Sequence, residues 1–539
     1  NLSFSAFLQP FSPVAPGLFR PVTILSYVLD AGIGGMQPWI FHASNILLHA
    51  VASILVFLLT RKLLQQDIPA LAASLLFAVH PVHTEAVTWV SGRSELLAAM
   101  FVLVGVLFHL QSVGARHALP LQLGSALAYF LALSSKEIAV SLPFVLALLP
   151  FIHSRISQKD RTNSILLLLF VFIALSIYLL LRVGALGSLT IPLAHTRTAG
   201  LPTLDRLLLM PPVIARYILL MVFPWGLRLE YDWSSFPFLI TAGSILLMIL
   251  LLGLGWWLFR RGERVAAFGI AWFFFFLLPV ANIIPIGELI AERFLYLPSV
   301  GFCILVGALF SSTEPRNRGA NGEVMEFVSR LRSSKTVLII MGTILLVFSS
   351  LTIRRNLDWR DPEILWRKTL ALSPEAPHAR ENLIVMLLAR GDLKEAGSLL
   401  AEELPRFPEK PMLHFLAGQL FRRTREDERA KKHFELALEL GKPGNVEFTD
   451  FQRASVLLEL WRFAEALPLL EHAASENPFD PSLLNNLGVA QAQLGKFPEA
   501  ILSFERAIAL YEEQGSLSEE DQRNLAGARG NLEMLRGVQ

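Results

Sequence analysis

Three short clusters of ionisable side chains interrupt long apolar stretches of the chain. They are His80-Pro81-Val82-His83-Thr84-Glu85 with Gly92-Arg93-Ser94-Glu95, then Ser134-Ser135-Lys136-Glu137, and then Glu288 with Glu292-Arg293. Ionisable groups in or beside a membrane are costly to place there and usually serve a function. Carboxylates and histidines can transfer protons, and Lys and Arg can bind phosphate.

In the first cluster, two histidines three residues apart precede a carboxylate. His80, His83 and Glu85 could hold a metal ion, or they could position a hydroxyl acceptor or a phosphate. The structural alternative is a helix-capping loop with ordinary hydrogen bonds, and a proline at the start of a new helix fits that alternative. We expect contacts with a substrate rather than a metal site.

The other two clusters place a cation beside an acid at the end of an apolar stretch. Lys136 either extends its amine to the membrane surface or binds an anionic headgroup. Arg293, next to Glu292, either forms an internal ion pair or binds phosphate through its fixed fork of donors. We expect phosphate contacts at both cations.

Other polar residues are weaker candidates. Arg20 precedes a proline near the start of the chain, and Asp232, within Tyr231-Asp232-Trp233, could be a catalytic carboxylate. Asn45 and His49, four residues apart in one apolar stretch, are expected to hydrogen-bond between helices. No glycine-rich phosphate loop, nucleophile elbow or dinucleotide fingerprint occurs. The clusters therefore suit a lipid-linked, phosphate-bearing donor better than nucleotide chemistry.

The composition divides the 539 residues into two parts. Of the 92 Asp, Glu, Lys and Arg residues, 38 lie in residues 1–353 (about 11% of that part) and 54 lie in residues 354–539 (about 29%). Soluble domains contain about 25% charged residues. Residues 1–353 are therefore predicted to form a membrane domain and residues 354–539 a water-soluble one. The single cysteine, Cys303, excludes a disulfide framework, and the net charge of +2 gives no footprint for nucleic acid.

Ten apolar stretches are candidates for membrane spans, which need about 20 residues unless neighbours shield their ends. They are residues 39–60, 65–80, 94–111, 118–134, 138–153, 164–182, 237–259, 265–285, 294–311 and 336–353. An eleventh stretch, 204–223, contains two prolines and two arginines, and we expect a broken or interfacial helix rather than a full span. Basic loops mark the cytoplasmic side. The polar clusters and the soluble part are then expected on the other side, with Arg354-Arg355 as a local exception.

The soluble part repeats with a period of about 34 residues. Ala396, Ala430, Ala466 and Ala500 mark the repeats; Leu400, Phe434, Leu470 and Phe504 follow by four residues, and Glu403, Ala437, Ala473 and Ala507 by seven. Prolines close successive units at Pro374, Pro408, Pro443 and Pro478. This pattern resembles the tetratricopeptide repeat and predicts four helical pairs after a leading half-unit. Such arrays present a groove to peptides or proteins.

The motifs together resemble the transmembrane and tetratricopeptide-repeat (TMTC-like) family of protein O-mannosyltransferases, including its bacterial relatives. The matching segments are Phe19-Arg20-Pro21-Val22-Thr23, residues 41–49, residues 76–87, residues 92–99, Lys136-Glu137, Tyr231-Asp232-Trp233 and residues 292–301. The resemblance implies an all-α chain: a polytopic C-type (GT-C-like) glycosyltransferase domain, with about ten spans here and one upstream, followed by a repeat solenoid.

The resemblance also implies roles for individual residues. Lys136, Arg293 and Arg93 would contact the donor phosphate, while Arg20, His80, His83, Glu85 and Glu292 would line the substrate pocket. The family's catalytic base is an acidic pair just upstream of the Arg-Pro segment, and residues 1–18 contain no Asp or Glu. Because the chain begins at Asn1, we expect this pair and the first span to lie further upstream, which leaves Glu85 and Asp232 as weak candidates here.

The resulting hypothesis is a glycosyltransferase that uses a polyprenyl-phosphate sugar such as dolichyl-phosphate mannose. It would mannosylate Ser or Thr of a polypeptide held by the repeats, on the extracytoplasmic face, with the cations in place of a metal and with no cofactor. The alternatives are a non-catalytic membrane scaffold that recruits proteins, or transfer to a glycan or lipid. We expect a bacterial inner membrane with periplasmic repeats, or alternatively the endoplasmic reticulum with lumenal repeats.

Overall fold

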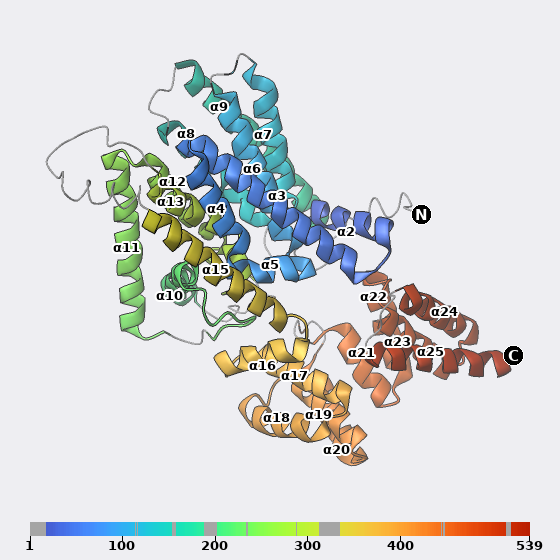
Figure 1. Ribbon diagram of the computed structural model, residues 1–539. Helices are drawn as coiled ribbons and strands as arrows, with labels where there is room; N and C mark the ends of the chain where they lie inside the picture. The colour runs from blue at the N-terminus through green and yellow to red at the C-terminus, as the bar shows by residue number, and fades with distance from the viewer. Residues whose placement is uncertain are drawn as a thin grey trace. The chain divides into compact units, whose positions relative to one another are not determined.

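The computed structural model describes residues 18–113, 115, 117–152, 158–187, 202–232, 236–286, 288–311, 335–442, 445, 448–513 and 519–538. Every regular element in these residues is a helix, as the sequence predicts. The chain divides into two compact units (Figure 1). The first comprises Asn1–Asp30 and Trp39–Pro362, and the second comprises Ala31–Pro38 and Glu363–Gln539. The predicted domain boundary after residue 353 falls inside the last helix of the first unit, α15 (Lys335–Asp358).

The first unit contains apolar helices of very different lengths. They are α2 (Pro21–Gly34), α3 (Pro38–Leu64), α4 (Asp67–Val79), η2 (Pro81–His83), α5 (Thr84–Thr88), η3 (Val90–Gly92), α6 (Arg93–Ser112), α7 (Ala118–Leu133), η4 (Glu137–Ser141), α8 (Leu142–Ile152), α9 (Gln158–Leu186), α10 (Thr203–Val222), α11 (Phe238–Arg261), α12 (Arg264–Leu277), η6 (Leu278–Val280), η7 (Glu292–Leu295), α13 (Pro298–Leu309) and α15 (Lys335–Asp358).

Five described helices are long and apolar enough to cross a membrane. They are Pro38–Leu64, Val90–Ser112, Ile165–Leu186, Phe238–Arg261 and Leu338–Asp358. Asp67–Val79 and Pro81–Thr88 form a sixth candidate that is bent by 48°. The other predicted stretches coincide with shorter apolar helices, so the number of spans stays a prediction. Residues 204–223 form α10, which continues unbroken through Pro211 and Pro212 and is not among the candidate spans.

A close crossing of α12 and α13 holds the end of the bundle that carries the polar clusters. A Cβ atom added to Gly269 of α12 would lie 2.6 Å from the carbonyl oxygen of Gly301 in α13. Beside this crossing, the buried Trp272 indole donates to the carbonyl of Leu297 at 2.9 Å. Small residues allow such close contact between membrane helices. The crossing fixes η7 and Arg293, which immediately precede α13.

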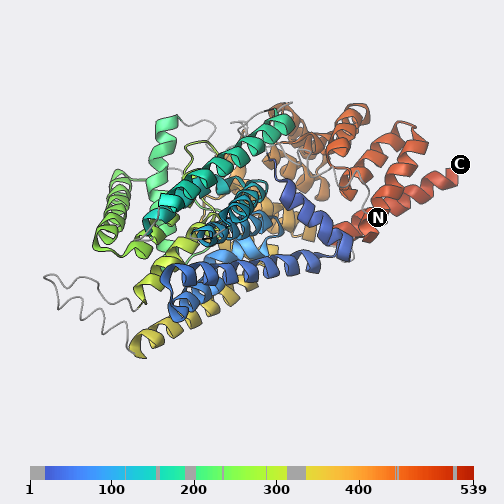
Figure 2. The same ribbon diagram turned by 90° about the horizontal axis from the view of Figure 1, so that it is seen from above.

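The second unit consists of antiparallel helical pairs, which Figure 2 shows side by side in orange to red. After α16 (Pro362–Leu372) come α17 (Pro377–Arg390) with α18 (Leu393–Arg406), α19 (Pro411–Arg423) with α20 (Asp427–Leu440), α21 (Asp450–Glu459) with α22 (Phe463–Glu476), and α23 (Pro481–Gln493) with α24 (Phe497–Glu513). The four pairs and the leading half-unit match the prediction. A further helix, α25 (Glu519–Val538), was not predicted.

The repeat positions have the burial that the period predicts. The alanines at 396, 430, 466 and 500 are fully buried, and the positions four and seven residues later are at most 5% exposed. Glu403 is the one acid among them, and it pairs with Arg380 and with Arg406 at 3.1 Å. The turns inside the four pairs place residues 391, 425, 461 and 495 at positive φ, with glycine at only the first and last. Pro443 lies outside the described residues.

Candidate functional site

Three cations from distant parts of the sequence converge at one end of the first unit. Arg20 precedes α2, Lys136 lies between α7 and η4, and Arg293 lies in η7. The Lys136 amine and the Arg293 guanidinium lie 5.3 Å and 5.2 Å from the centroid of the same ring, Phe294. The charges of Arg20 and Arg293 both act on Lys136. We call Arg20, Lys136 and Arg293 the cation cluster.

Two of these cations are held by buried carboxylates from other elements. Lys136 pairs with Glu95 of α6, and Arg293 pairs with Glu85 of α5. The backbone N–H of Arg293 also donates to Glu85, at 2.9 Å. Both carboxylates are 1% exposed, while the Arg293 side chain is 16% exposed. The carboxylates therefore position the cations, and Arg293 remains partly accessible.

The third cation shares its carboxylate with another arginine. Arg20 donates to Glu137 of η4 at 2.8 and 3.2 Å, and Arg182 of α9 donates to the other oxygen of Glu137 at 3.0 Å. Glu137 therefore holds two guanidinium groups at once. The Arg20 and Glu137 side chains are 23% and 34% exposed, so this pair lies at an accessible position.

The protonation of Lys136 reflects its surroundings. Burial lowers its pKa to about 8, Glu95 counteracts this, and Arg20 and Arg293 lower the pKa further. Burial also opposes the charge of Arg293, but Glu85 raises the Arg293 pKa overall. An anion bound beside Lys136 would reduce the repulsion among the three cations and would favour the charged lysine.

Glu292 and Arg293 are neighbours in sequence but have different partners. Glu292 is fully buried, accepts a hydrogen bond from the Tyr231 hydroxyl at 2.8 Å, and accepts another from the backbone N–H of Arg228. Arg355 of α15 lies 3.7 Å from its other oxygen. Burial raises the Glu292 pKa to about 7, Arg355 counteracts this, and Glu85 adds to the increase. Glu292 and Arg293 therefore do not pair with each other, whereas Arg293 does form an internal ion pair, with Glu85.

Arg355 explains the local exception to the charge rule. It is 5% exposed and lies 3.5 Å from Asp358 as well as near Glu292. In the same helix, Asn356 accepts from Thr88 at 3.0 Å, and Thr352 donates to the carbonyl of Val79 at 2.7 Å. The end of α15 is therefore packed against the polar clusters, where acids hold Arg355. The orientation of the chain in the membrane stays a prediction.

The two histidines of the first cluster form hydrogen bonds with backbone groups. His83 Nδ1 lies 2.8 Å from the carbonyl of Phe77 and its Nε2 lies 2.8 Å from the Ser299 hydroxyl. His80 Nε2 lies 3.0 Å from the carbonyl of Met221, and its Nδ1 accepts from the backbone two residues later. A ring nitrogen that faces a carbonyl must carry the proton, so His83 Nδ1 and His80 Nε2 are donors, and the second nitrogen of each ring also has a hydrogen-bond partner. Substrate contacts of His80 and His83 stay a prediction.

The expected helix-to-helix hydrogen bonds of Asn45 and His49 are confirmed. Asn45 donates to the carbonyls of Val87 and Trp89, both at 3.2 Å, and accepts from Arg93. His49 of α3 lies 2.8 Å from the Tyr296 hydroxyl, which follows η7. These bonds connect α3 to the segments around α5 and η7, which carry Glu85 and Arg293.

Arg93 is enclosed by partners different from those of the cation cluster. It is 1% exposed and pairs with Asp30 of α2 at 2.6 Å. Its Nε donates to Asn45 at 2.8 Å, one terminal nitrogen donates to the carbonyl of Phe41 at 2.8 Å, and the guanidinium lies 4.6 Å from the Tyr27 ring centroid. The sequence analysis missed Asp30, although a lone acid in an apolar helix is itself a signal for a buried partner.

The two weak candidates for a catalytic carboxylate have different environments. Glu85 is buried and is occupied by Arg293, whereas Asp232 is exposed and its charge acts on Arg228. Trp233, the last residue of that motif, lies outside the described residues. Within the described residues, no group of three His, Cys, Asp or Glu side chains could hold a metal ion.

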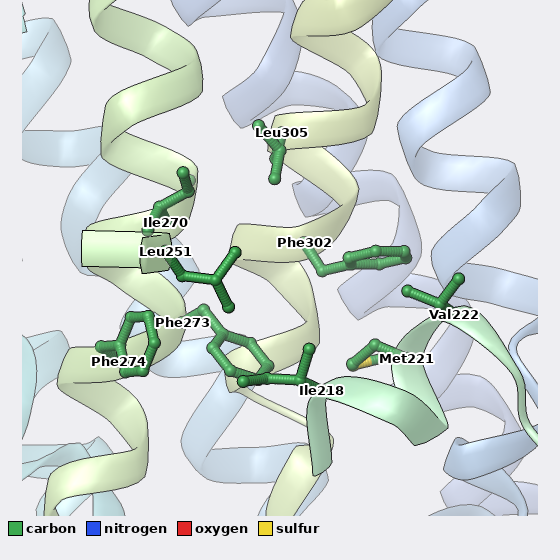
Figure 3. Close-up of a pocket in the computed structure, with 10 residues that line it drawn as sticks. Ile218, Met221, Val222, Leu251, Ile270, Phe273, Phe274, Phe302 and Leu305 are labelled. Carbon is green, nitrogen blue, oxygen red and sulfur yellow. The ribbon is translucent and has the colours of Figure 1, made fainter. Parts of the chain in front are cut away.

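An apolar cavity of about 160 Å³ lies beside the polar clusters (Figure 3). Side chains from α10, α11, α12 and α13 line it, and all of them are apolar. Met221 of its wall carries the carbonyl that His80 bonds, and Tyr217, one residue before the lining Ile218, accepts from the Ala291 N–H just ahead of η7. The cavity suits a hydrocarbon segment rather than a sugar phosphate.

Comparison with known proteins identifies relatives of both units. A family model of the tetratricopeptide repeat matches residues 358–411 and 451–514. The chain is 30% identical over 497 residues to protein O-mannosyl-transferase Tmtc1 of Drosophila melanogaster, with 74% of this chain and 55% of that protein covered. It is 25% identical over 457 residues to protein O-mannosyl-transferase TMTC3 of Homo sapiens, with 78% and 48% covered. The chain thus spans about half the length of these relatives.

Among solved structures, the chain resembles YrrB, a tetratricopeptide-repeat protein with an unusual peptide-binding site, at 21% identity and a TM-score of 0.21, over 32% of this chain and 94% of that one. It also resembles yeast Tom70 at 13% identity and a TM-score of 0.26, over 90% and 96% of the two chains. The predicted resemblance is confirmed by the curated relatives and the repeat match: the chain is an all-α membrane protein homologous to the transmembrane and tetratricopeptide-repeat protein O-mannosyl-transferases.

Proposed function

We propose that the protein transfers mannose from a polyprenyl-phosphate donor to hydroxyl groups of a polypeptide. The observation that carries the proposal is the convergence of Arg20, Lys136 and Arg293 at one end of the bundle. A phosphate leaving group needs cations that stabilise the charge it gains in the transition state. The cluster supplies them, and the carboxylates behind Lys136 and Arg293 keep them in place.

The lipid part of the donor fits the apolar surroundings of the cluster. The cavity beside η7 has only apolar walls, and several neighbouring helices are apolar enough to face lipid. An isoprenoid chain would gain from burial there, while its phosphate lies at the polar end of the bundle. This division matches the amphipathic character of a polyprenyl phosphate.

The carboxylates around the cluster are assigned to positioning. Glu85, Glu95 and Glu137 each pair with a cation. A carboxylate that is paired in this way fixes the position of its cation. The acceptor hydroxyl still requires a base. The resemblance to the family assigns that role to an acidic pair other than these three carboxylates.

The acceptor side of the reaction rests on the repeats. The end of α15 packs against the polar clusters, so the chain leaves the first unit at the end that carries the cation cluster. Repeat arrays of this kind bind peptides and proteins along a groove. We therefore propose that the second unit delivers a polypeptide to the cluster, and that both act outside the cytoplasm.

The test measures transfer of radiolabelled mannose from polyprenyl phosphate in nanodiscs, with the full-length protein and a protein acceptor. Removal of one cation would leave a buried carboxylate unpaired, so each variant removes a pair: Lys136→Met with Glu95→Gln, and Arg293→Met with Glu85→Gln. The matched control, Arg61→Gln with Asp67→Asn, removes an exposed pair at 2.6 Å between α3 and α4.

We expect both paired variants to lose transfer by at least about 100-fold while they keep their Tm within a few degrees, because a donor placed at developing charge contributes about 10²–10³ in rate. The control should transfer like the wild type. Full activity of both folded variants would refute the phosphate site. No transfer by the wild type, combined with partner binding by the repeats, would favour the scaffold.

A further inference from the structure

A basic turn with exposed tryptophans lies between α11 and α12. Arg260 and Arg261 end α11 and Arg264 begins α12, with Glu263 as the only acid of the turn. The Arg261 guanidinium lies 5.2 Å from the centroid of the Trp257 ring, and that of Arg260 lies 5.8 Å from Trp256. In the part of the chain that the structure describes, none of the three arginines pairs with a carboxylate.

An apolar groove of about 450 Å³ begins directly at this turn, between α8, α11 and α12. Apart from Arg264, its walls are apolar, and they include Phe151, Trp256, Phe268 and Ala271. Arg264 also donates to the carbonyl of Phe151 at 3.3 Å, so the guanidinium is held at the mouth of the groove.

The groove lies beside the exposed apolar face of α11, which suits contact with lipid. Along α11, Leu246, Ile249 and Leu250 are 56%, 60% and 61% exposed, and only 6% of its apolar window is buried. Trp256 is 62% exposed beside the basic turn. Tryptophan concentrates at the interface between membrane and water. Exposed tryptophans beside a basic turn are therefore the pattern expected at headgroup level, and the apolar groove that begins there suits an acyl chain.

This site is separate from the cation cluster. Near the other end of α12, the carbonyl of Phe275 accepts from Ser141, which ends η4, the element next to Lys136. Phe275 lies eleven residues beyond Arg264 (275 − 264), which corresponds to about 16 Å along the helix. A donor whose phosphate binds the cation cluster cannot also place that phosphate at the basic turn.

We propose that the basic turn and the groove bind one anionic phospholipid of the bilayer. Arg260, Arg261 and Arg264 would hold the phosphate of the headgroup, and one acyl chain would lie in the groove. Guanidinium groups match phosphate oxygens in geometry and charge. Three arginines against one acid favour an anionic headgroup over a zwitterionic one.

The test is native mass spectrometry of the full chain in detergent, titrated with phosphatidylglycerol or phosphatidylcholine of the same chain length. The first variant carries Arg260→Gln, Arg261→Gln and Arg264→Gln. The second, Ala271→Phe, fills the groove and keeps the arginines. The matched control replaces the basic pair Arg61 and Lys62 at the end of α3 by glutamine.

The wild type should bind one phosphatidylglycerol saturably and at least about tenfold more tightly than phosphatidylcholine. Each arginine lost should weaken this binding by about fivefold, and Ala271→Phe should weaken it for both lipids. The control should bind like the wild type. Equal affinity of the wild type for both lipids would overturn the proposal, as would unchanged binding by Ala271→Phe or an equal loss in the control. Arg264→Gln alone gives the same test if the triple variant does not fold.

Discussion

Substitution of Arg93 best distinguishes an arginine that stabilises the fold from one that binds phosphate. The sequence analysis placed it with Lys136 and Arg293, but the structure encloses it with Asp30 and Asn45. Replacing Arg93 by alanine would leave the Asp30 carboxylate, 9% exposed, without its cation. We therefore expect Arg93→Ala to unfold the first unit more readily rather than to weaken donor binding selectively.

The magnitude follows from the burial of the pair. Breaking a buried ion pair by removal of one partner costs about 3–5 kcal/mol, because the remaining charge is left without compensation. At about 2–4 °C per kcal/mol, Tm should fall by roughly 10 °C. The double variant Arg93→Met with Asp30→Asn removes both charges, so it should recover a large part of this loss.

The assay is thermal unfolding in the same detergent, combined with a donor-binding titration at a temperature where the variant is folded. The expected result is a large fall in Tm for Arg93→Ala, partial recovery in the double variant, and donor affinity within about threefold of the wild type. A Tm within about 2 °C of the wild type, together with lost donor binding, would refute the reasoning and restore Arg93 as a phosphate ligand.

Three further predictions follow from other parts of the chain. Burial lowers the Lys136 pKa to about 8; the lysine is charged below that pH, so KM for the donor should rise as the pH increases through about 8, and Lys136→Arg should remove this rise in a pH series. Gly269→Ala would force its Cβ against the carbonyl of Gly301; we expect a loss of about 1–3 kcal/mol in chemical unfolding, whereas Gly253→Ala, which meets no atom within 4 Å, should be nearly neutral. Trp461 has φ = +61° at a repeat turn; Trp461→Gly should therefore stabilise the second unit by about 1 kcal/mol, and an unchanged or lower unfolding midpoint in urea would contradict this.

The repeats were predictable because their determinants are local and periodic. Ala396 and its equivalents recur every 34 to 36 residues, and each is buried in a helical pair. The turns were less visible, because Arg425 and Trp461 occupy left-handed positions that glycine normally marks. The helix α25 has no such repeat signature and was missed for that reason.

The site was predictable in its residue types but not in its pairings. Lys136 and Arg293 stand out because each is a cation at the end of an apolar stretch, and the structure places both over Phe294. Their partners, Glu95 and Glu85, lie 41 and 208 residues away in sequence. A single sequence carries no signal for such long-range pairs.

Sequence neighbours mislead at this site for a geometric reason. Consecutive residues in a helix or extended segment point in different directions, so adjacent opposite charges do not face each other. Lys136 accordingly pairs with Glu95 while Glu137 binds Arg20, and Arg293 pairs across the bundle rather than with the preceding residue.

The pairing of each cation with a carboxylate from another element also determines what the cluster can do. Each cation is fixed by a carboxylate from another element, so the cluster exists only when α5, α6, η4 and η7 are assembled. The carboxylates lie behind the cations, buried, while Arg20 and Arg293 remain partly exposed. Burial lowers the pKa of Lys136, and the charges of Arg20 and Arg293 lower it further, which indicates that positive charge accumulates at the cluster. An anion that approaches from the accessible side would gain from all three cations at once, which favours a phosphate at this position over a neutral sugar.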